Sequence, residues 1–295
     1  MKIFLAGGTG FVGGHVRRAL LEKGHVILLL THRRELETED GIINVKGDVS
    51  RPEIYGEAMR GCDAVINLVG IIREFPDRQV TFTRLHREAT RNLVDSAQRT
   101  GVKRFLQMSA LGARPRAVSD YHKSKFQAEE YIRASKLDYT IFRPSIIFGP
   151  KDEFVNKLAG FIRNYPAVPV IGSGTYRLQP VAANDVARCF AMALEMPETI
   201  GNTYELCGPD QLTYNEMLDI IGKALGKSSV AKLKSPLGLM KLATRFMQGF
   251  SFFPVTLDQI RMLLEENICS SGWPETFGFE PIRFSEGIRS YLDRK

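Results

Sequence analysis

The sequence lacks several features that would assign it to a specialised class of protein. It contains no apolar run long enough to span a bilayer, and residues 1–6 read as the beginning of a core strand rather than as a cleavable signal. The chain has four cysteines and no Cys-x-x-Cys pair, so we expect isolated thiols with no disulfide or metal-binding role at Cys62, Cys189, Cys207 and Cys269. These absences indicate a cytoplasmic protein without a metal site.

Basic residues exceed acidic ones, but the excess does not point to nucleic acid. The formal net charge is +7, yet the basic residues form no long run interleaved with aromatic side chains. Part of the excess is local, because no acidic residue occurs between Asp219 and Asp258. Within that stretch, residues 236–253 read as a helix with an apolar face and a basic opposite face. The pattern fits the core of a small lobe, an interfacial helix on anionic lipid, a lipophilic substrate pocket or a surface that docks on a membrane complex.

The chain has 295 residues, of which 44% are hydrophobic and 25% charged, as is ordinary for a globular protein with a full core. Strand-like and helical patterns alternate through the first half, which predicts an α/β fold with a doubly wound parallel Rossmann sheet. The expected strands are Ile3–Ala6, Val26–Leu30, Ile42–Val45, Ala64–Val69, Arg104–Met108 and Tyr139–Phe142, and the expected helices cover 11–23, 53–60, 83–100 and 121–135.

The alternation of strand-like and helical patterns becomes less regular after Gly149-Pro150, where prolines and glycines mark turns. We therefore predict a dinucleotide-binding Rossmann domain over residues 1–150, to which residues 179–206 return. Residues 151–295 would mainly form a smaller C-terminal lobe that holds a substrate or contacts a partner.

The first predicted strand runs directly into a glycine-rich turn. Its glycines satisfy both G-x-G-x-x-G and G-x-x-G-x-x-G, and such glycines let the backbone approach a pyrophosphate and pack closely against the next helix. The N-terminus of that helix would direct N–H groups at the phosphates. We predict that the turn binds a dinucleotide, with a merely structural turn as the alternative. The residues concerned are Gly7, Gly8, Thr9, Gly10, Phe11, Val12 and Gly13.

The residues after the second predicted strand bear on which dinucleotide is preferred. Arg33 and Arg34 occur there before the first acid, Glu35. Arginine accommodates the 2′-phosphate of NADP, whereas an acid binds the free ribose hydroxyl of NAD. The sequence therefore favours NADP(H), with NAD(H) as the alternative. Asp48 and Val49 follow the third strand and are expected to border the adenine.

A Tyr-x-x-x-Lys motif lies on a predicted helix, with Tyr121 and Lys125 on one face because residues i and i+4 are neighbours. An ammonium beside a phenol stabilises the phenolate, so the pKa of Tyr121 is expected to fall toward neutrality. Lys125 could also bind the nicotinamide ribose. Ser109, at the end of a predicted strand, is expected to polarise a substrate carbonyl. The alternative is an ordinary amphipathic helix.

These motifs together resemble the short-chain dehydrogenases/reductases of the extended or atypical kind, which are NAD-dependent epimerase/dehydratase-like. Segments 143–150, 179–181 and 184–187 resemble the family as well, so the resemblance covers nearly the whole chain. The resemblance implies further cofactor contacts from Leu68, Val69, Gly70, Pro144 and Ile147.

Three sequence segments are similar to one branch of the family: residues 65–74, 108–113 and 204–209. That branch holds the NADPH-binding accessory subunit of respiratory complex I and its bacterial relatives, which implies cofactor binding more than turnover. The chain departs from extended members at His86, where they usually carry asparagine. His86 could hydrogen-bond the cofactor in place of that asparagine, or it could simply pack inside the protein.

Three functions follow as hypotheses. The first is an NADP(H)-dependent oxidoreductase that acts on a carbonyl or quinone-like small molecule through Ser109, Tyr121 and Lys125, and the intact trio favours it. The second is a cofactor-binding structural or assembly subunit of a membrane respiratory complex, peripheral to the inner membrane. The third is a nucleotide-sugar epimerase or dehydratase, although the C-terminal lobe shows no nucleotide-sugar signature. A homodimer is a further expectation from the family.

Overall fold

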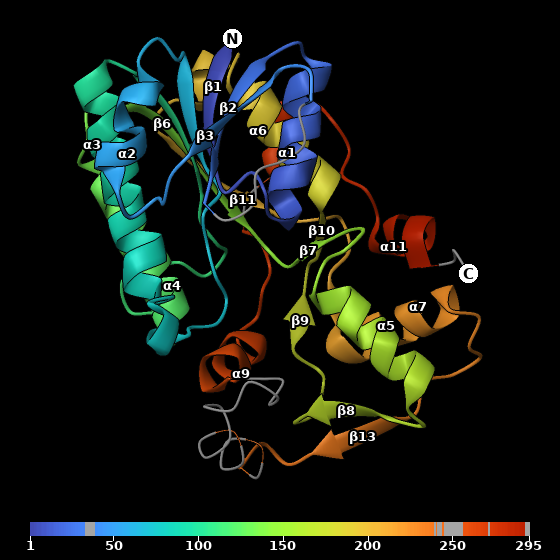
Figure 1. Ribbon diagram of the computed structural model, residues 1–295. Helices are drawn as coiled ribbons and strands as arrows, with labels where there is room; N and C mark the ends of the chain where they lie inside the picture. The colour runs from blue at the N-terminus through green and yellow to red at the C-terminus, as the bar shows by residue number, and fades with distance from the viewer. Residues whose placement is uncertain (33–38, 239, 241–243, 245–255, 271, 293–295) are drawn as a thin grey trace. The chain divides into compact units, whose positions relative to one another are not determined.

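The computed structural model describes residues 1–32, 39–238, 240, 244, 256–270 and 272–292 (Figure 1). The chain divides into two compact units. Unit 1 comprises residues 1–144 and 184–205, and unit 2 comprises residues 145–183 and 206–295.

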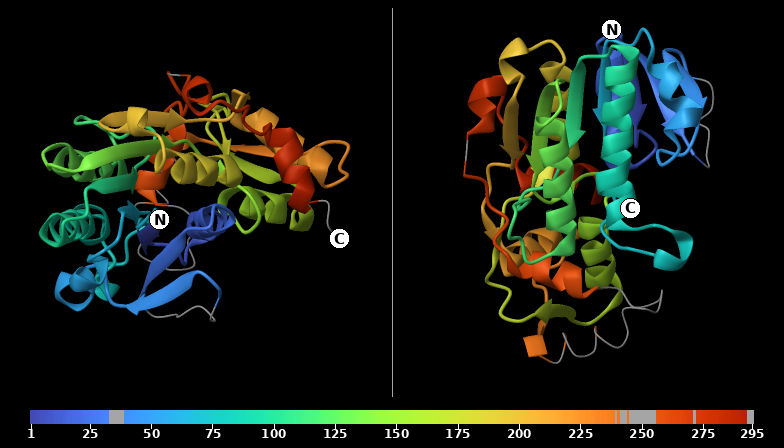
Figure 2. Two further views of the ribbon diagram at one scale, coloured as in Figure 1. Left: turned by 90° about the horizontal axis from the view of Figure 1, so that it is seen from above. Right: turned by 90° about the vertical axis from the view of Figure 1, so that its left-hand side faces the viewer.

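Unit 1 is built on a seven-stranded sheet with the order β11-β6-β5-β4-β1-β2-β3. Figures 1 and 2 show this sheet from three sides. All pairings from β3 to β6 are parallel, which confirms the predicted Rossmann sheet. The order reverses between β1 and β4, the place where ligands bind in open α/β sheets. The strands are β1 (Lys2–Ala6), β2 (Val26–Thr31), β3 (Ile42–Lys46), β4 (Ala64–Asn67), β5 (Arg104–Met108), β6 (Asp138–Pro144) and β11 (Asn202–Leu206).

Helices cover the sheet of unit 1, as the blue, cyan and teal ribbons of Figure 1 show. One face packs against α2, α3 and α4 through a core that includes Phe4, Phe105, Leu93 and Ile132. Burial of this apolar surface is the main source of the unit's stability. The helical segments are α1 (Phe11–Glu22), α2 (Pro52–Tyr55), η1 (Gly56–Met59), η2 (Pro76–Arg78), η3 (Thr83–Glu88), α3 (Ala89–Thr100), α4 (Asp120–Arg133), α6 (Ala183–Ala193) and η4 (Pro197–Thr199).

The predicted helix over 83–100 consists of two parts. Its first six residues, η3, form a π-helix, and α3 continues from Ala89. π-Turns inside helices are rare and frequently occur at functional sites. Here the π-turn holds the buried ring of His86, which stacks on Phe82 with ring centroids 5.2 Å apart.

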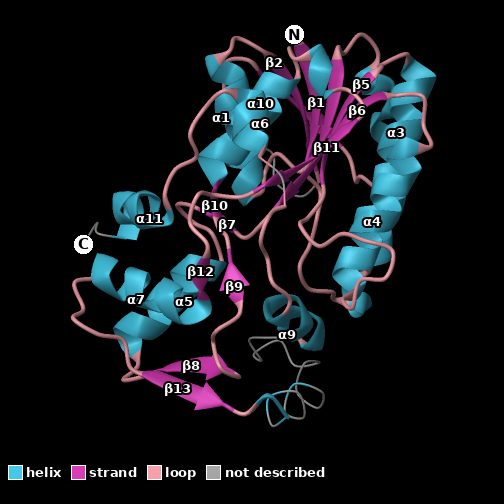
Figure 3. Ribbon diagram, turned by 180° about the vertical axis from the view of Figure 1, so that it is seen from behind, coloured by secondary structure: helices cyan, strands magenta, loops and turns pink. Residues whose placement is uncertain are grey.

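In its described residues, unit 2 has several helices and three two-stranded sheets. Figure 3 shows these elements from behind. Its core lies between α5, α7 and α11 and includes Val155, Leu158, Met217 and Phe284. The helices are α5 (Phe154–Asn164), α7 (Tyr214–Ala224), α9 (Leu257–Leu264), α10 (Trp273–Phe277) and α11 (Phe284–Leu292), and the strands are β7 (Ile147–Phe148), β8 (Val168–Ile171), β9 (Arg177–Leu178), β10 (Val181–Ala182), β12 (Leu212–Thr213) and β13 (Lys232–Ser235).

The cysteines of unit 2 correct one expectation from the sequence. Cys207 and Cys269 form a disulfide across a sequence separation of 62, so they are not isolated thiols. Cys62 and Cys189 are free and buried. Residues so far apart carry no spacing signal, and only folding brings the loop before α10 against the end of β11. The expectation of a cytoplasmic protein therefore loses the support that isolated thiols gave it.

No helix among the residues that the structure describes is long and apolar enough to cross a membrane. Within the acid-free stretch 236–253, residues 239, 241–243 and 245–253 lie outside the described residues. An amphipathic helix there stays a prediction.

Candidate functional site

The glycine turn joins β1 to α1. Gly7 has φ +80°, and a Cβ there would lie 2.7 Å from the backbone carbon of Leu68. A Cβ at Gly13 would lie 2.5 Å from the carbonyl oxygen of Gly7, and one at Gly8 would lie 2.4 Å from a methyl of Leu29. At Gly10 the nearest atom would be 3.4 Å away. Gly7, Gly8 and Gly13 thus permit close packing within the turn, whereas Gly10 leaves its outer side open.

The N-terminus of α1 has the electrostatic character of an anion site. Gly10 caps the helix without a side chain, and no acidic residue lies in the first turn. The first N–H groups of the helix therefore lack a side-chain cap, and the helix dipole meets no carboxylate from the first turn. Together with the open side of Gly10, this arrangement fits the pyrophosphate of a dinucleotide.

In the parallel sheet, β2 lies beside β1 and β3 lies beside β2. The residues that follow β2 and β3 therefore leave the sheet at the same edge as the glycine turn. Arg33 and Arg34 lie outside the described residues, and Thr31 and His32 precede them without an acid. Burial would raise the pKa of Asp48, but hydrogen bonds from Ser50 and nearby positive charges hold it below its ordinary value. One of those charges is the guanidinium of Arg84, 3.4 Å from the carboxylate.

Three of the other predicted cofactor contacts are core residues: Val49 and Leu68 are buried, and Val69 packs against the core of unit 1. A Cβ at Gly70 would lie 2.9 Å from Nζ of Lys125. The carbonyl of Val49 accepts the hydroxyl of Tyr55 at 3.0 Å. The N–H of Val69 donates to the side chain of Asn67 at 3.0 Å, which fixes the loop after β4.

Asn67 belongs to a buried polar group that the sequence analysis did not identify. Its amide nitrogen donates to Gln107 at 2.9 Å and to Thr90 at 3.1 Å. Asn67 and Gln107 interrupt otherwise apolar strands, and that interruption was the available signal. Because buried polar groups require partners, the trio aligns β4, β5 and α3.

His86 has protein partners at both ring nitrogens. Nε2 accepts the backbone N–H of Ile71 at 3.0 Å, and Nδ1 lies 2.8 Å from the hydroxyl of Ser124. Since Nε2 accepts, the neutral ring carries its proton on Nδ1. Burial, and then the charge of Lys125, lower the pKa of His86 to about 2. The ring is thus a neutral bridge between the loop after β4 and α4, and a contact of His86 with the cofactor stays a prediction.

Tyr121 and Lys125 lie one turn apart on α4, and both contact the region of His86. The rings of Tyr121 and His86 are 5.4 Å apart and nearly perpendicular. The ammonium of Lys125 donates to the carbonyls of Val69 and Met108 at 3.4 and 3.3 Å. The motif therefore places the ammonium of Lys125 at the carboxyl ends of β4 and β5 and the ring of Tyr121 against His86.

The pKa values of this pair correct the expectation of an acidified phenol. Burial raises the pKa of Tyr121 to about 12 instead of lowering it. Burial also lowers the pKa of Lys125 to about 8, although the negative charge of Glu129 acts to raise it. In the protein alone, desolvation outweighs any stabilisation of the phenolate by the ammonium.

Ser109 donates its hydroxyl to Glu129, a carboxylate with no exposed surface. Arg143 binds the same carboxylate through two hydrogen bonds of 2.8 and 2.6 Å, and Arg133 adds a third at 2.8 Å. Sequence analysis missed Glu129, although its position four residues after Lys125 puts it on the same helix face. The hydroxyl expected to polarise a substrate is thus held inside a buried ion-pair network.

The remaining predicted residues belong to different units. Pro144 ends β6 in unit 1 and accepts the N–H of Leu111 at 2.9 Å. Ile147 lies in β7 of unit 2, where it pairs with Val181. No cluster suited to a metal ion occurs among the described residues.

Comparison with known proteins gives a family match and several relatives. The model of the family described as NAD(P)H-binding matches residues 7–197. Subunit 9 of the NADH dehydrogenase [ubiquinone] 1 alpha subcomplex, a mitochondrial protein of Arabidopsis thaliana, is 29% identical over 282 residues, 90% of this chain and 70% of the relative. The ceramide reductase of Caulobacter vibrioides is 31% identical over 193 residues, 63% of this chain and 58% of the enzyme.

A solved structure extends the likeness to the whole fold. The UDP-glucose 4-epimerase of Thermus thermophilus, in complex with NAD, superposes with a TM-score of 0.78 and 19% identity over 99% of this chain and 98% of the epimerase. At this identity the match concerns the fold alone.

Two adjacent glycines test the role of the turn. Gly13→Ala places a Cβ against the backbone of Gly7, whereas a Cβ at Gly14 meets nothing within 4 Å. We expect Gly13→Ala to weaken NADPH binding at least about tenfold, because the turn must shift. Gly14→Ala should leave the Kd unchanged and stabilise α1 by up to about 1 kcal/mol. Isothermal titration and urea unfolding measure both effects. Equal Kd values for the two variants would contradict the role given to Gly13.

The neutral state of His86 predicts a pH dependence of stability. Its folded pKa lies below the unfolded value, so the unfolded chain binds more protons and stability falls as the pH drops below about 6.5. Between pH 7 and pH 5 the wild type should lose about 2 kcal/mol more than His86→Asn, which cannot titrate. Urea unfolding at the two pH values measures the difference, with His32→Asn at an exposed site as control. Identical losses in wild type and His86→Asn would show that His86 is not neutral by burial.

Proposed function

The chain belongs to the NAD(P)H-binding family, and from this premise we propose that it is an NADP(H)-holding subunit or assembly protein of a membrane redox complex. The observation that carries the proposal is the engagement of Ser109 by Glu129. A hydroxyl has a single proton, and one that donates it to a buried carboxylate has none left to stabilise charge on a substrate oxygen. The Arabidopsis relative, a complex subunit by name and matched over 90% of this chain, supports the same role.

The residues of unit 1 would hold the dinucleotide as follows. The turn at Gly10 and the N-terminus of α1 would bind the pyrophosphate, and Asp48 with Val49 would border the adenine. Lys125 would bind the nicotinamide ribose by exchanging one of its two backbone carbonyl acceptors for a ribose hydroxyl. When bound, the cofactor supplies a hydride donor or acceptor.

The preference for NADP(H) rests on the residues that follow β2. Thr31 and His32 offer no carboxylate for a ribose hydroxyl, and Arg33 and Arg34 come next in the chain. Guanidinium groups bind phosphate through paired N–H donors, so a 2′-phosphate would gain attraction where NAD would gain none.

A second candidate is an NADP(H)-dependent reductase of carbonyl or quinone-like compounds. One observation favours it: Tyr121 and Lys125 lie one turn apart on α4, with Lys125 at the carboxyl ends of β4 and β5 and Tyr121 against His86, an arrangement that suits a proton donor and its charged neighbour. Tyr121 would donate its proton to the carbonyl oxygen, and Lys125 would stabilise the phenolate left behind. The ceramide reductase relative adds support. Nucleotide-sugar epimerisation has only the likeness of fold in its favour.

Affinity for the two cofactors tests the binding site. We expect NADPH to bind at least about tenfold more tightly than NADH, the equivalent of one favourable charge-assisted contact. Replacement of Arg33 and Arg34 by alanine should abolish that difference and leave NADH binding unchanged. Isothermal titration measures all four dissociation constants. An NADH Kd as low as that for NADPH would refute the NADP preference, and failure to bind either cofactor would refute the proposal as a whole.

Turnover separates the two candidate functions. For a cofactor-holding subunit we expect no NADPH oxidation above background with quinones, lipophilic ketones or sugar-derived carbonyls, although NADPH binds. For a reductase, Tyr121→Phe should lower the rate about 100-fold or more without changing NADPH binding. Tyr131→Phe, on the exposed side of the same helix, is the matched control. A rate that collapses only in Tyr121→Phe would replace the first proposal by the second.

A further inference from the structure

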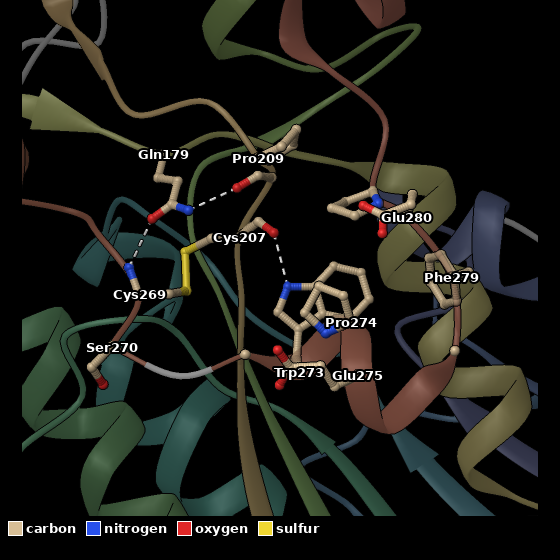
Figure 4. Close-up of a pocket in the computed structure, with 14 residues that line it drawn as sticks. Gln179, Cys207, Pro209, Cys269, Ser270, Trp273, Pro274, Glu275, Phe279 and Glu280 are labelled. Carbon is tan, nitrogen blue, oxygen red and sulfur yellow. Dashed lines mark hydrogen bonds between the residues drawn. A yellow bond between two sulfur atoms is a disulfide. The ribbon is translucent and has the colours of Figure 1, made fainter.

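Unit 2 contains a pocket of about 730 Å³ with the Cys207–Cys269 disulfide in its wall (Figure 4). Both cysteines line the pocket, together with Trp273, Glu275 and Glu280. We propose that this disulfide is a redox site that exchanges with small thiols entering the pocket, and that the pocket selects against anionic thiols. The inference uses residues of unit 2 alone and does not depend on the proposed function.

The two cysteines of the disulfide differ in how exposed each residue is. Cys207 is buried, with 3% of its surface exposed, whereas Cys269 is only half-buried. Thiol–disulfide exchange proceeds by attack of a thiolate on one sulfur, and the more accessible sulfur reacts. An entering thiolate would therefore attack Sγ of Cys269.

The exchange balances in two steps. Attack on Cys269 forms a mixed disulfide and releases Cys207 as a thiolate, which takes up the proton lost by the first thiol. A second thiol then attacks the sulfur of the bound reductant, forms the oxidised disulfide of the reductant and releases Cys269 as a thiol. The protein disulfide gains two electrons and two protons, and two thiol molecules lose them.

Charge in the pocket gives the selectivity. Among the lining residues that the structure describes, the charged side chains are the exposed carboxylates Glu275 and Glu280, and none is basic. The attacking form of mercaptoacetate carries two negative charges, whereas the thiolate of cysteamine is balanced by its ammonium. Two carboxylates in the lining would repel the former and tolerate the latter, because like charges in a cleft lower the local concentration of an anion.

The surrounding hydrogen bonds would keep the pocket assembled after reduction. The N–H of Cys269 donates to Gln179 at 3.1 Å, and Gln179 donates to the carbonyl of Gly208 at 2.7 Å. The indole of Trp273 donates to the carbonyl of Cys207 at 2.8 Å. These bonds join the same two segments as the disulfide. Reduction should therefore leave unit 2 folded while it changes the surroundings of Trp273, the single tryptophan of the chain.

The experiment compares reduction of the full-length oxidised protein by cysteamine and by mercaptoacetate. Maleimide labelling in denaturant counts thiols over time, and fluorescence of Trp273 follows the native protein. Each rate is divided by the rate of the same thiol with a small neutral disulfide, which removes intrinsic differences in reactivity. We expect two thiols before and four after reduction, and a normalised rate roughly tenfold higher for cysteamine at low salt.

Paired variants test the role of the carboxylates. Replacing Glu275 and Glu280 by glutamine should bring the ratio of cysteamine to mercaptoacetate rates close to one. Glu286→Gln also replaces a carboxylate by an amide, but outside the pocket, and it should leave the ratio unchanged. If the double variant fails to fold, the wild type alone still tests the proposal. Added salt should then lower its ratio of cysteamine to mercaptoacetate rates, because salt screens the repulsion between the carboxylates and the anionic thiol. Four thiols in the oxidised protein, no reduction without unfolding, or equal normalised rates in the wild type at low salt would overturn the proposal.

Discussion

A carboxylate removed from water must be surrounded by donors, and the geometry of unit 1 around its candidate site depends on this requirement at Glu129. The side chain has no exposed surface, and its oxygens receive bonds from Ser109, Arg133 and Arg143. Breaking a buried ion pair of this kind is far more costly than losing an exposed one. The network therefore fixes the rotation of α4 against β5 and β6, and so the direction in which Tyr121 and Lys125 face.

A second set of buried polar groups fixes the loop after β4. Asn67 holds the N–H of Val69, and His86 holds the N–H of Ile71 on one side and Ser124 on the other. The loop is thus tied to both α3 and α4 by neutral hydrogen bonds, which depend less on salt than surface ion pairs. Such a framework provides a rigid wall beside the glycine turn, as preorganised binding of a cofactor requires.

The candidate site combines features of an enzyme with features of a binder. The open turn at Gly10 and the inward ammonium of Lys125 suit a dinucleotide in either case. Burial raises the pKa of Tyr121, and the hydroxyl of Ser109 donates to Glu129. Unit 2 adds a different chemistry, because its disulfide lies in the wall of an acidic pocket rather than inside a core.

The sequence by itself determined the parallel sheet and the glycine turn, because both depend on local chemistry: periodicity of apolar residues and the conformations open to glycine. It also paired Tyr121 with Lys125, since helical spacing is a local property. Only the tertiary structure decided that Ser109 meets Glu129 and that Cys207 meets Cys269, 62 positions away. Contacts between distant residues leave no mark in local spacing, and the burial that shifts the pKa of Tyr121 exists only once the chain has folded.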